Sequence, residues 1–251
     1  GWMSQLCREL NTTTSTLKAL AARGLVKIEV RSKRRNPMGR QAILPTKPLP
    51  LNSHQQNVLE AIEKADKPVL LYGITGSGKT EVYLQAIAGQ LEAGRGSIVM
   101  VPEISLTPQT VRRFASRFGE RVAVLHSALS DGERYDEWHR IRSGAAKVVI
   151  GPRSAVFAPV RGLGLIVVDE EHESTYISDR HPRYDARDVA AYRAENEGAT
   201  LLLASATPSI LSFARARRGD YTLLEMPNRV MNRPLPEVEI IDMRQELEQG
   251  N

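Results

Sequence analysis

The sequence predicts an α/β protein in which a mostly parallel sheet has helices on both faces, preceded by a small separate domain. Three observations support this prediction. A glycine-rich motif of the phosphate-binding kind spans Gly73–Thr80. Apolar, β-branched runs alternate with helical patterns after residue 51, which is typical of strands buried on both faces. A basic segment precedes them and ends at the proline-rich stretch Leu44–Pro50.

The composition is that of an ordinary globular protein. The 251 residues are 41% hydrophobic and 25% charged, and this length allows one large domain or a large and a small one. Cys7 is the only cysteine, which excludes an internal disulfide and a cysteine-based zinc site within this chain. No apolar run approaches the roughly 18 residues of a membrane span, and no secretory leader pattern opens the sequence. We therefore expect a cytoplasmic protein with no membrane partner, and the missing initiator Met indicates a piece of a longer chain.

Positive charge is concentrated near the N-terminus. Residues 1–50 contain ten lysines and arginines and two acids, a net charge of +8. Residues 51–251 contain 24 basic and 27 acidic residues, a net charge of −3. An excess of this kind on one module is what binding to a phosphate backbone requires.

Residues 1–44 have the outline of a winged-helix domain. Met3–Leu10 and Ser15–Ala22 have helical patterns, and Leu25–Arg31 alternates like a strand before a basic turn. Winged helices often bind DNA, but they also serve as spacers between proteins, and a solvated charged loop is the plainer interpretation. Nucleic-acid contact in this domain is assigned to Arg31, Lys33, Arg34 and Arg35.

An extended linker at residues 45–51 is expected before a larger domain at residues 52–228. Helices are expected at Gln55–Ala65, Lys79–Glu92, Thr107–Phe118, Asp131–Ser143, Ala186–Glu197 and Ser209–Arg217. Strands are expected at Val69–Tyr72, Ile98–Val101, Val122–Leu125, Lys147–Ile150, Leu165–Val168 and Thr200–Ala204. Ligands of parallel sheets bind at the carboxyl ends of the strands, so the chemistry is expected in the loops that follow these runs.

The motif Gly73-Ile-Thr-Gly-Ser-Gly-Lys-Thr80 lies between an expected strand and an expected helix, the context that a phosphate loop needs. Its glycines let backbone N–H groups face phosphate oxygens, and the helix N-terminus adds partial positive charge. Lys79 is placed to reach the β- and γ-phosphates of ATP, and Thr80 to ligate Mg²⁺. A glycine- and serine-rich turn that fits by chance is the alternative. The predicted nucleotide-binding residues of this segment are Gly73, Thr75, Gly76, Ser77, Gly78, Lys79, Thr80 and Glu81.

Two carboxylates follow the expected strand Leu165–Val168. Asp169 is placed to hold Mg²⁺, directly or through water, and Glu170 to orient and deprotonate an attacking water. Together with Lys79 they are the predicted catalytic residues, and a solvated acidic turn is the alternative.

Ser205 and Thr207 follow the last expected strand, in the tripeptide Ser-Ala-Thr. They suit a cap for the helix that begins after Pro208, since proline favours a first helical turn. They also suit a coupling between the nucleotide site and a nucleic-acid site, and the tripeptide alone does not decide between the two.

These motifs, in this order, resemble the first RecA-like lobe of superfamily 2 helicases. Five segments together are similar to the bacterial replication-restart helicases of that superfamily: Gly73–Tyr83, Val101–Gln109, Leu125–Ser127, Gly151–Ala155 and Asp169–His172. The resemblance covers most of residues 51–251, and the family also places a winged helix before the lobe. It implies a P-loop, RecA-like sheet in an ATP-dependent 3′-to-5′ DNA helicase that acts at stalled replication forks.

The resemblance also implies roles outside the two main motifs. Gln55 is positioned like an adenine-recognising glutamine, and His172 like a residue that links the ATP site to Ser205 and Thr207. A polar residue of a first helical turn, and a satisfied histidine, remain the alternatives for these two. The path of single-stranded DNA is implied at Pro102, Glu103, Arg153 and Ser154, with a surface ion pair as the alternative for Arg153.

Residues 173–185 occupy the place of an aromatic loop that stacks on exposed bases in the family, which assigns Tyr176 and Tyr184 to DNA contact. Relatives often have a tryptophan in this loop and this sequence has none, which puts the strength of coupling between DNA and ATP in doubt. A flexible connection is the alternative.

The family continues into a second lobe that supplies arginine fingers, and zinc is expected only there; residues 229–251 are expected to lead toward it. Without that lobe, this chain is predicted to bind ATP, to hydrolyse it very slowly and not to unwind DNA. The implied partners are forked or single-stranded DNA, other primosome proteins and single-strand-binding protein. The alternatives are another superfamily 2 DNA translocase, a nucleotide-gated scaffold for DNA or proteins, and a small-molecule P-loop kinase.

Overall fold

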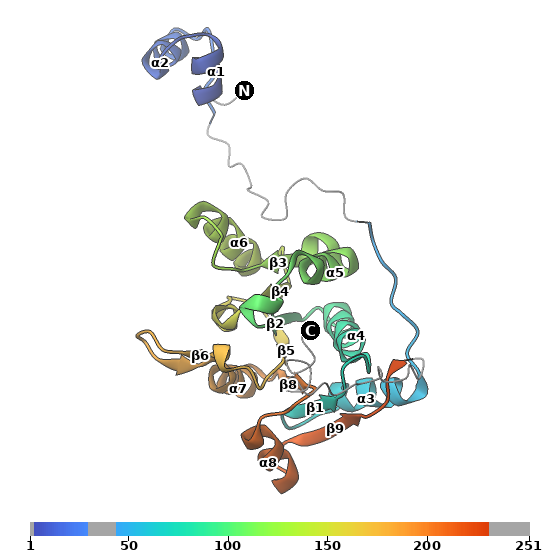
Figure 1. The fold of residues 1–251 in the computed structure, drawn as a ribbon. Coiled ribbons are helices and arrows are strands. Elements are labelled where there is room, and N and C mark those ends of the chain that lie inside the picture. The colour runs from blue at the N-terminus through green and yellow to red at the C-terminus, as the bar shows by residue number, and fades with distance from the viewer. Residues whose placement is uncertain (1–2, 30–43, 231–251) are drawn as a thin grey trace, which may run out of the picture. The chain divides into compact units, whose positions relative to one another are not determined.

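The computed structural model describes residues 3–29 and 44–230 (Figure 1). The chain divides into two compact units, Gly1–Arg35 and Asn36–Asn251. No helix in the described ranges is long and apolar enough to cross a membrane.

The N-terminal unit contains two short helices, α1 (Met3–Glu9) and α2 (Thr14–Ala22). The helix α2 begins after Thr13, whose side-chain oxygen accepts a hydrogen bond from the backbone N–H of Thr16 and so caps the helix. Both helices agree with the sequence prediction to within a residue. The expected strand differs: Leu25–Glu29 has no strand structure. The basic turn with Arg31, Lys33, Arg34 and Arg35 lies outside the described residues, so the winged helix stays a prediction.

A parallel sheet of seven strands forms the centre of the larger unit, as predicted for its fold class. The strands lie in the order β3-β4-β2-β5-β8-β1-β9, and every neighbouring pair is parallel. Their bounds are β1 Val69–Gly73, β2 Gly96–Met100, β3 Val122–Val124, β4 Val148–Gly151, β5 Leu163–Asp169, β8 Thr200–Ser205 and β9 Thr222–Met226.

Helices cover both faces of the sheet (Figure 1). One layer consists of α3 (Ser53–Glu63), α4 (Lys79–Glu92) and α5 (Pro108–Phe118). The other consists of α6 (Asp131–Ser143), α7 (Ala186–Glu197) and α8 (Ile210–Arg218). Neighbouring residues of one strand pack on opposite layers: Leu71 faces the first and Leu70 the second, and both are fully buried. This two-sided burial explains why the strands have uninterrupted apolar sequences.

The six strands and six helices expected in this unit are all present, with ends shifted by at most about two residues, as is usual for element boundaries. The strand β9 was not expected. It lies at the edge of the sheet, its sequence Thr-Leu-Leu-Glu-Met is only partly buried, and its pairing with β1 brings Gly73 opposite Met226. Short 3₁₀ helices lie at Glu103–Ser105, Gly119–Arg121, Arg153–Phe157 and Ser174–Tyr176, and a small hairpin joins β6 (Ile177–Ser178) to β7 (Tyr184–Asp185).

The strand order brings three distant motifs to one edge of the sheet. In the sequence of neighbours β5-β8-β1, Asp169 lies beside Ala204, and Ser205 lies beside Tyr72. Because these strands are parallel, their carboxyl ends meet at the same edge, and the loops after them meet as well.

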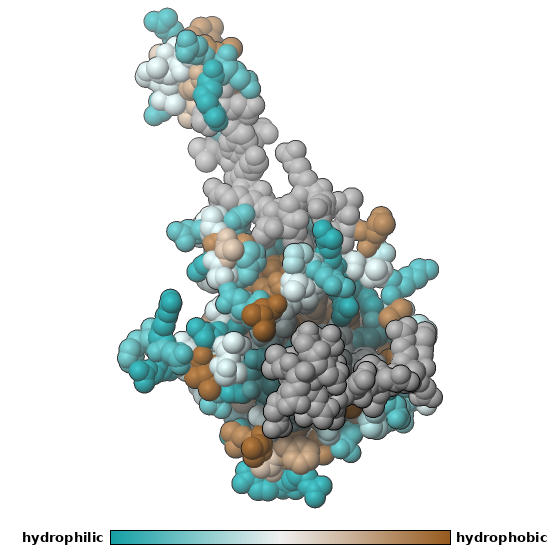
Figure 2. Space-filling model, in the orientation of Figure 1, coloured by the Kyte–Doolittle hydropathy of each residue, from teal (hydrophilic) through white to brown (hydrophobic). Residues whose placement is uncertain are grey.

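The surface of the larger unit is mixed, with apolar side chains gathered on α8 (Figure 2). Ile210, Leu211 and Phe213 of this helix are exposed, Ile210 by 91%. They follow directly on the loop after β8.

Candidate functional site

The loop between β1 and α4 is shaped by glycines in left-handed backbone conformations. Gly76 has φ +83° and Gly78 has φ +90°, where a side chain would be strained. A Cβ atom at Gly78 would also collide with the side-chain amide of Gln55. Gly78 is the N-cap of α4, so the loop delivers its backbone directly onto the amino end of that helix.

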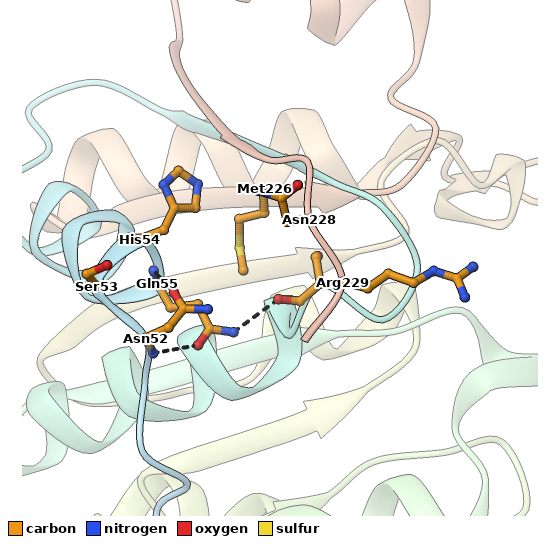
Figure 3. Close-up of a pocket in the computed structure, with 8 residues that line it drawn as sticks. Asn52, Ser53, His54, Gln55, Met226, Asn228 and Arg229 are labelled. Atoms are coloured by element: carbon orange, nitrogen blue, oxygen red, sulfur yellow. Dashed lines mark hydrogen bonds between the residues drawn. The ribbon is translucent and has the colours of Figure 1, made fainter. Parts of the chain in front are cut away.

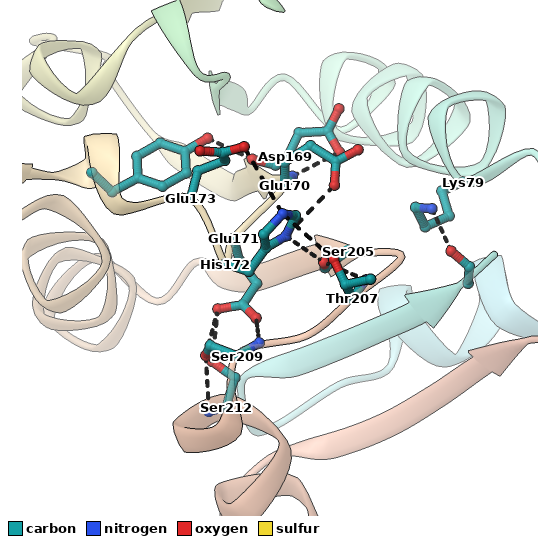
Figure 4. Close-up of polar contacts among 12 residues, drawn as sticks. Lys79, Asp169, Glu170, Glu171, His172, Glu173, Ser205, Thr207, Ser209 and Ser212 are labelled. Carbon is teal, nitrogen blue, oxygen red and sulfur yellow. Dashed lines mark hydrogen bonds and ion pairs between the residues drawn. The ribbon is translucent and has the colours of Figure 1, made fainter. Parts of the chain in front are cut away.

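Lys79 begins α4, and its ammonium group lies over the loop. Nζ donates a hydrogen bond to the backbone carbonyl of Gly73, which holds the side chain across the loop between β1 and α4 (Figure 4). Burial lowers the pKa of Lys79, while the nearby carboxylates of Glu170 and Asp169 act in the opposite direction. The charge of the lysine is therefore stabilised by both acids predicted to share its site.

A cavity of about 400 Å³ joins the loop to the acidic strand end. Lys79, Thr80, Asp169 and Glu170 all line it, so residues about ninety positions apart in sequence face one space. Its lining consists of Leu49, Ile74, Thr75, Gly76, Ser77, Gly78, Lys79, Thr80, Glu81, Leu84, Arg113, Asp169 and Glu170.

Asp169 is half-buried at the end of β5 and is held by two donors. The hydroxyl of Tyr83 donates to Oδ2 at 2.9 Å, and the backbone N–H of Glu170 donates to Oδ1 at 3.1 Å. Burial raises the pKa of Asp169, and the hydrogen bond from Tyr83 opposes that rise. Sequence reasoning missed Tyr83; its position four residues after Lys79, which puts both side chains on one face of α4, was the available signal.

Glu170 leaves the strand in a left-handed conformation, with φ 46°. Non-glycine residues adopt this region infrequently, and it often marks a functional turn. The turn separates the side chain from that of Asp169 and leaves its carboxylate partly exposed at the cavity, 3.7 Å from Nδ1 of His172.

Glu171 is fully buried and was not assigned a role from the sequence. Its carboxylate accepts hydrogen bonds from the backbone N–H of Ser209 at 2.6 Å, from the Ser209 hydroxyl at 3.1 Å and from the Ser212 hydroxyl at 2.9 Å (Figure 4). The carboxylate therefore ties the end of β5 to the first turn of α8, where a negative charge is favoured. Its place directly after the acidic pair was the only sequence signal.

His172 joins the acidic turn to the loop after β8. Its Nδ1 shares a hydrogen bond of 2.8 Å with the Ser205 hydroxyl, and Nε2 lies 3.5 Å from the hydroxyl of Thr207. Ser205 in turn accepts a hydrogen bond from the backbone N–H of Thr207. A connected polar chain thus runs from the Glu170–His172 turn into the Ser-Ala-Thr segment.

A second cavity, of about 320 Å³, also borders the phosphate loop, at Ser77 (Figure 3). Gln55 lines it and is 5% exposed; its side-chain Nε2 donates to the backbone carbonyl of Ser77 at 3.0 Å. Its Oε1 accepts from the backbone N–H of Asn52, completing a capping box on α3. The complete lining is Asn52, Ser53, His54, Gln55, Ser77, Met226, Asn228 and Arg229.

The carboxylate of Glu81 is held by other residues of the protein, although Glu81 also lines the cavity, so its assignment to nucleotide binding stays a prediction. Both oxygens receive hydrogen bonds from Arg117 of α5, at 3.0 and 2.9 Å, and Oε1 also accepts from the backbone N–H of Leu49 and from Gln85. Burial acts to raise the pKa of Glu81, but these hydrogen bonds outweigh it and lower the pKa. Glu81 therefore fastens the segment before α3 to α4 and α5.

The four residues predicted on a DNA path lie in the loops after β2 and β4. Pro102 is buried, while Glu103 is exposed and accepts a hydrogen bond from the Ser127 hydroxyl. Arg153 donates to the backbone carbonyls of Thr175 and Ile177, at 3.2 and 2.8 Å, and makes no ion pair with a residue that the structure describes. Its contact with DNA stays a prediction. Ser154 is exposed next to it.

The assignment of Tyr176 to base stacking is wrong in this structure. The ring is 1% exposed, and its hydroxyl donates to the backbone carbonyls of Met100 and Asp169 at 3.1 and 2.5 Å. The tyrosine is a core residue that fixes the strand ends. Tyr184 is half-buried, with its ring edge-on to Phe157 at 5.1 Å between centroids.

The residues present fit a magnesium ion carried with a nucleotide. No cluster of three or more histidine, cysteine, aspartate or glutamate side chains suited to a metal occurs within residues 3–29 and 44–230. Thr80 and Asp169 do face one cavity with Lys79. Magnesium usually takes one or two protein ligands and completes its shell with phosphate oxygens and water, so two oxygens are sufficient here.

A parallel sheet with a phosphate loop after one strand and an acidic pair after a near neighbour defines a P-loop protein. The family model of the DEAD/DEAH box helicases matches residues 52–214, and the chain belongs to that family.

Within the family, the chain is similar to proteins named replication restart protein PriA. It is 47% identical to that of Bacillus subtilis over 253 residues, covering 99% of this chain and 31% of the relative. It is 45% identical to that of Synechocystis, covering 100% of this chain and 31% of the relative. The chain thus spans about a third of the length of the curated relatives it matches.

Solved structures agree with the fold. A structure of RecG bound to a three-way DNA junction has 28% identity and a TM-score of 0.56, covering 81% of this chain and 27% of that one. The Hef helicase domain of Pyrococcus furiosus has a TM-score of 0.54 over 71% of this chain and 38% of that one, at 17% identity, which supports the fold alone.

Proposed function

We propose that this chain is the ATP-binding first lobe of a DNA helicase that acts in replication restart. The single observation that carries the proposal is the cavity that Lys79, Thr80, Asp169 and Glu170 line together. The names of the relatives support the process, and the DNA junction in the RecG structure supports a branched or single-stranded DNA partner. The 3′-to-5′ direction, other primosome proteins and single-strand-binding protein as partners, and a cytoplasmic location belong to the same proposal.

The polar groups that line the two cavities have distinct roles in this proposal. The loop N–H groups and Lys79 bind the phosphates, and the buried Gln55 borders the second cavity, where an adenine would lie. Thr80 and Asp169 would hold Mg²⁺, which neutralises charge on the phosphate oxygens when bound. Glu170, whose carboxylate is partly free, accepts the proton of the attacking water.

The polar chain beyond the cavity supports a role in coupling. His172 contacts Ser205 and lies near Thr207, and Glu171 holds the start of α8. A shift of the Glu170 turn would therefore move the loops at the carboxyl ends of β5 and β8 together. We propose that these residues transmit the nucleotide state to DNA bound at the neighbouring loops, including Glu103, Arg153 and Ser154.

Calorimetric titration of the chain with MgATPγS tests the nucleotide site. We expect saturable binding that Lys79→Ala weakens about tenfold or more, because a charge-assisted contact to phosphate is lost. Lys64→Ala is the matched control, since Lys64 is exposed and pairs only with Glu60 on α3 among the described residues. Absence of binding by the unsubstituted chain, or equal binding by Lys79→Ala, would reject the proposed function.

A further inference from the structure

Arg113 is a second cation of the nucleotide cavity, and no motif accounts for it. It lies on α5, outside the phosphate loop and the acidic turn, and it lines the same cavity as Lys79, Thr80, Asp169 and Glu170. Among the lining residues, Lys79 and Arg113 are the only cationic side chains.

The guanidinium group of Arg113 has no carboxylate partner among the described residues, whereas that of Arg117, one turn later on α5, has one. Arg117 makes two hydrogen bonds to Glu81, with side chains only 8% and 13% exposed. For Arg113, no side-chain hydrogen bond or ion pair is made with any residue in the described part of the chain. An arginine without a carboxylate partner at the rim of a cavity is available to an anionic ligand.

Arg113 shares its cavity with the residues proposed to hold the metal. Thr80 and Asp169 line the same space as Arg113. Tyr83 donates a hydrogen bond to Asp169 at 2.9 Å, which holds the carboxylate in place at this cavity. The guanidinium charge therefore lies in the space where Asp169 would meet the metal and the outer phosphates.

The charge balance of the cavity favours a second cation. Asp169 and Glu170 bring two carboxylates to a space that must accept a polyanion, while the carboxylate of Glu81 is neutralised by Arg117. Lys79 already donates a hydrogen bond to the backbone carbonyl of Gly73. A planar guanidinium matches the geometry of a terminal phosphate group and would offset the repulsion from the two acids.

We propose that Arg113 binds the terminal phosphate of the nucleoside triphosphate from the side of α5, and so distinguishes the triphosphate from the diphosphate. This proposal rests on the function proposed above. It makes Arg113 a binding residue supplied by the lobe itself, separate from arginines expected from a second lobe.

Calorimetric titrations with MgATPγS and MgADP, on the unsubstituted chain and on Arg113→Ala, test this inference. We expect the affinity for MgATPγS to fall about tenfold to a hundredfold, as for one charge-assisted contact, and that for MgADP to fall less than about threefold. Arg113→Lys should recover part of the lost affinity for MgATPγS, because lysine restores the positive charge but not the two parallel N–H donors of the guanidinium group. Arg112→Ala is the control, since Arg112 is on the same helix but does not line this cavity.

Other outcomes separate the two proposals. If the unsubstituted chain binds neither nucleotide, both the proposed function and the role of Arg113 are rejected. If it binds both and Arg113→Ala leaves MgATPγS affinity unchanged, or weakens both nucleotides equally, only the role of Arg113 is overturned. The melting temperature of Arg113→Ala should match that of the unsubstituted chain, since the side chain is exposed.

Discussion

Asp169 shows how a single site residue is tuned by its surroundings. The strand delivers its carboxylate into a half-buried position, where desolvation disfavours the charged form. The hydroxyl of Tyr83 and the backbone of Glu170 offset part of that penalty. The carboxylate is thus held in place at a strand end and forms no ion pair with a residue in the described ranges, which suits a group that would meet a metal ion.

The pH dependence of stability tests this environment. Because the native carboxyl group of Asp169 binds a proton more tightly than in the unfolded chain, stability from this group is lost as the pH rises from 3.8 through the raised pKa. In nucleotide-free, magnesium-free buffer, the melting temperature of Asp169→Asn should therefore gain on that of the unsubstituted chain between about pH 4 and 8. We expect a gain of roughly 2–4 °C, which corresponds to about 1 kcal/mol. A difference that is constant with pH would contradict this account.

At the scale of elements, buried polar side chains join segments that are far apart in the sequence. Glu171 ties β5 to α8, and Glu81 ties α4 to Arg117 of α5 and to the backbone at Leu49. Gln85 of α4 donates a further hydrogen bond to the carbonyl of Leu49, so the proline-rich segment contacts α4 at this residue. This segment is part of the lobe's packing and not only a spacer.

Removal of the Glu171 carboxylate should loosen α8. Glu171→Ala removes the acceptor of the Ser209 N–H, of the half-buried Ser209 hydroxyl and of the buried Ser212 hydroxyl. We expect a loss of about 2 kcal/mol, or roughly 4–8 °C in melting temperature. The melting temperature of Glu171→Gln should lie between those of Glu171→Ala and the unsubstituted chain, because glutamine keeps one acceptor oxygen. Glu195→Ala, on the exposed face of α7, is the control and should change little. Thermal unfolding followed by circular dichroism measures all three, and an unchanged Glu171→Ala variant would contradict the role assigned to this carboxylate.

At the scale of the whole molecule, one cavity is lined by Lys79, Thr80, Asp169 and Glu170, and the chain spans about a third of the length of its curated relatives. Phosphoryl transfer in such proteins depends strongly on an arginine supplied from another domain or protein, which contributes roughly 10³- to 10⁵-fold. Binding and turnover are therefore separable properties of this chain.

We expect this chain to bind nucleotide but to release phosphate very slowly, with no unwinding. Malachite-green detection of phosphate from MgATP, with and without forked DNA, measures the first property, and strand displacement from the same fork measures the second. Rapid hydrolysis that DNA stimulates would show that the lobe needs no arginine from elsewhere.

Much of the site was predictable because its residues are consecutive in short motifs. Lys79 and Thr80 follow from the loop pattern, and Asp169 and Glu170 from acids directly after a buried run. Tyr83 and Glu171 were missed because the contacts that define them are made with residues of another element. Arg113 was missed because its place at the cavity depends on how α5 packs. Tyr176 was assigned wrongly because an aromatic residue in a loop has the same local sequence whether its ring packs inward or faces solvent.

The sequence by itself determined the fold class, the buried strands and the phosphate loop, because hydrophobic periodicity and glycine positions are local properties of the chain. Only the tertiary structure decided that β5, β8 and β1 are neighbours and that Glu81 belongs to Arg117. It also decided that Arg113 lines the same cavity as Lys79 and Asp169. The physical reason is that strand order and side-chain partners depend on contacts between segments far apart in sequence, which no local pattern records.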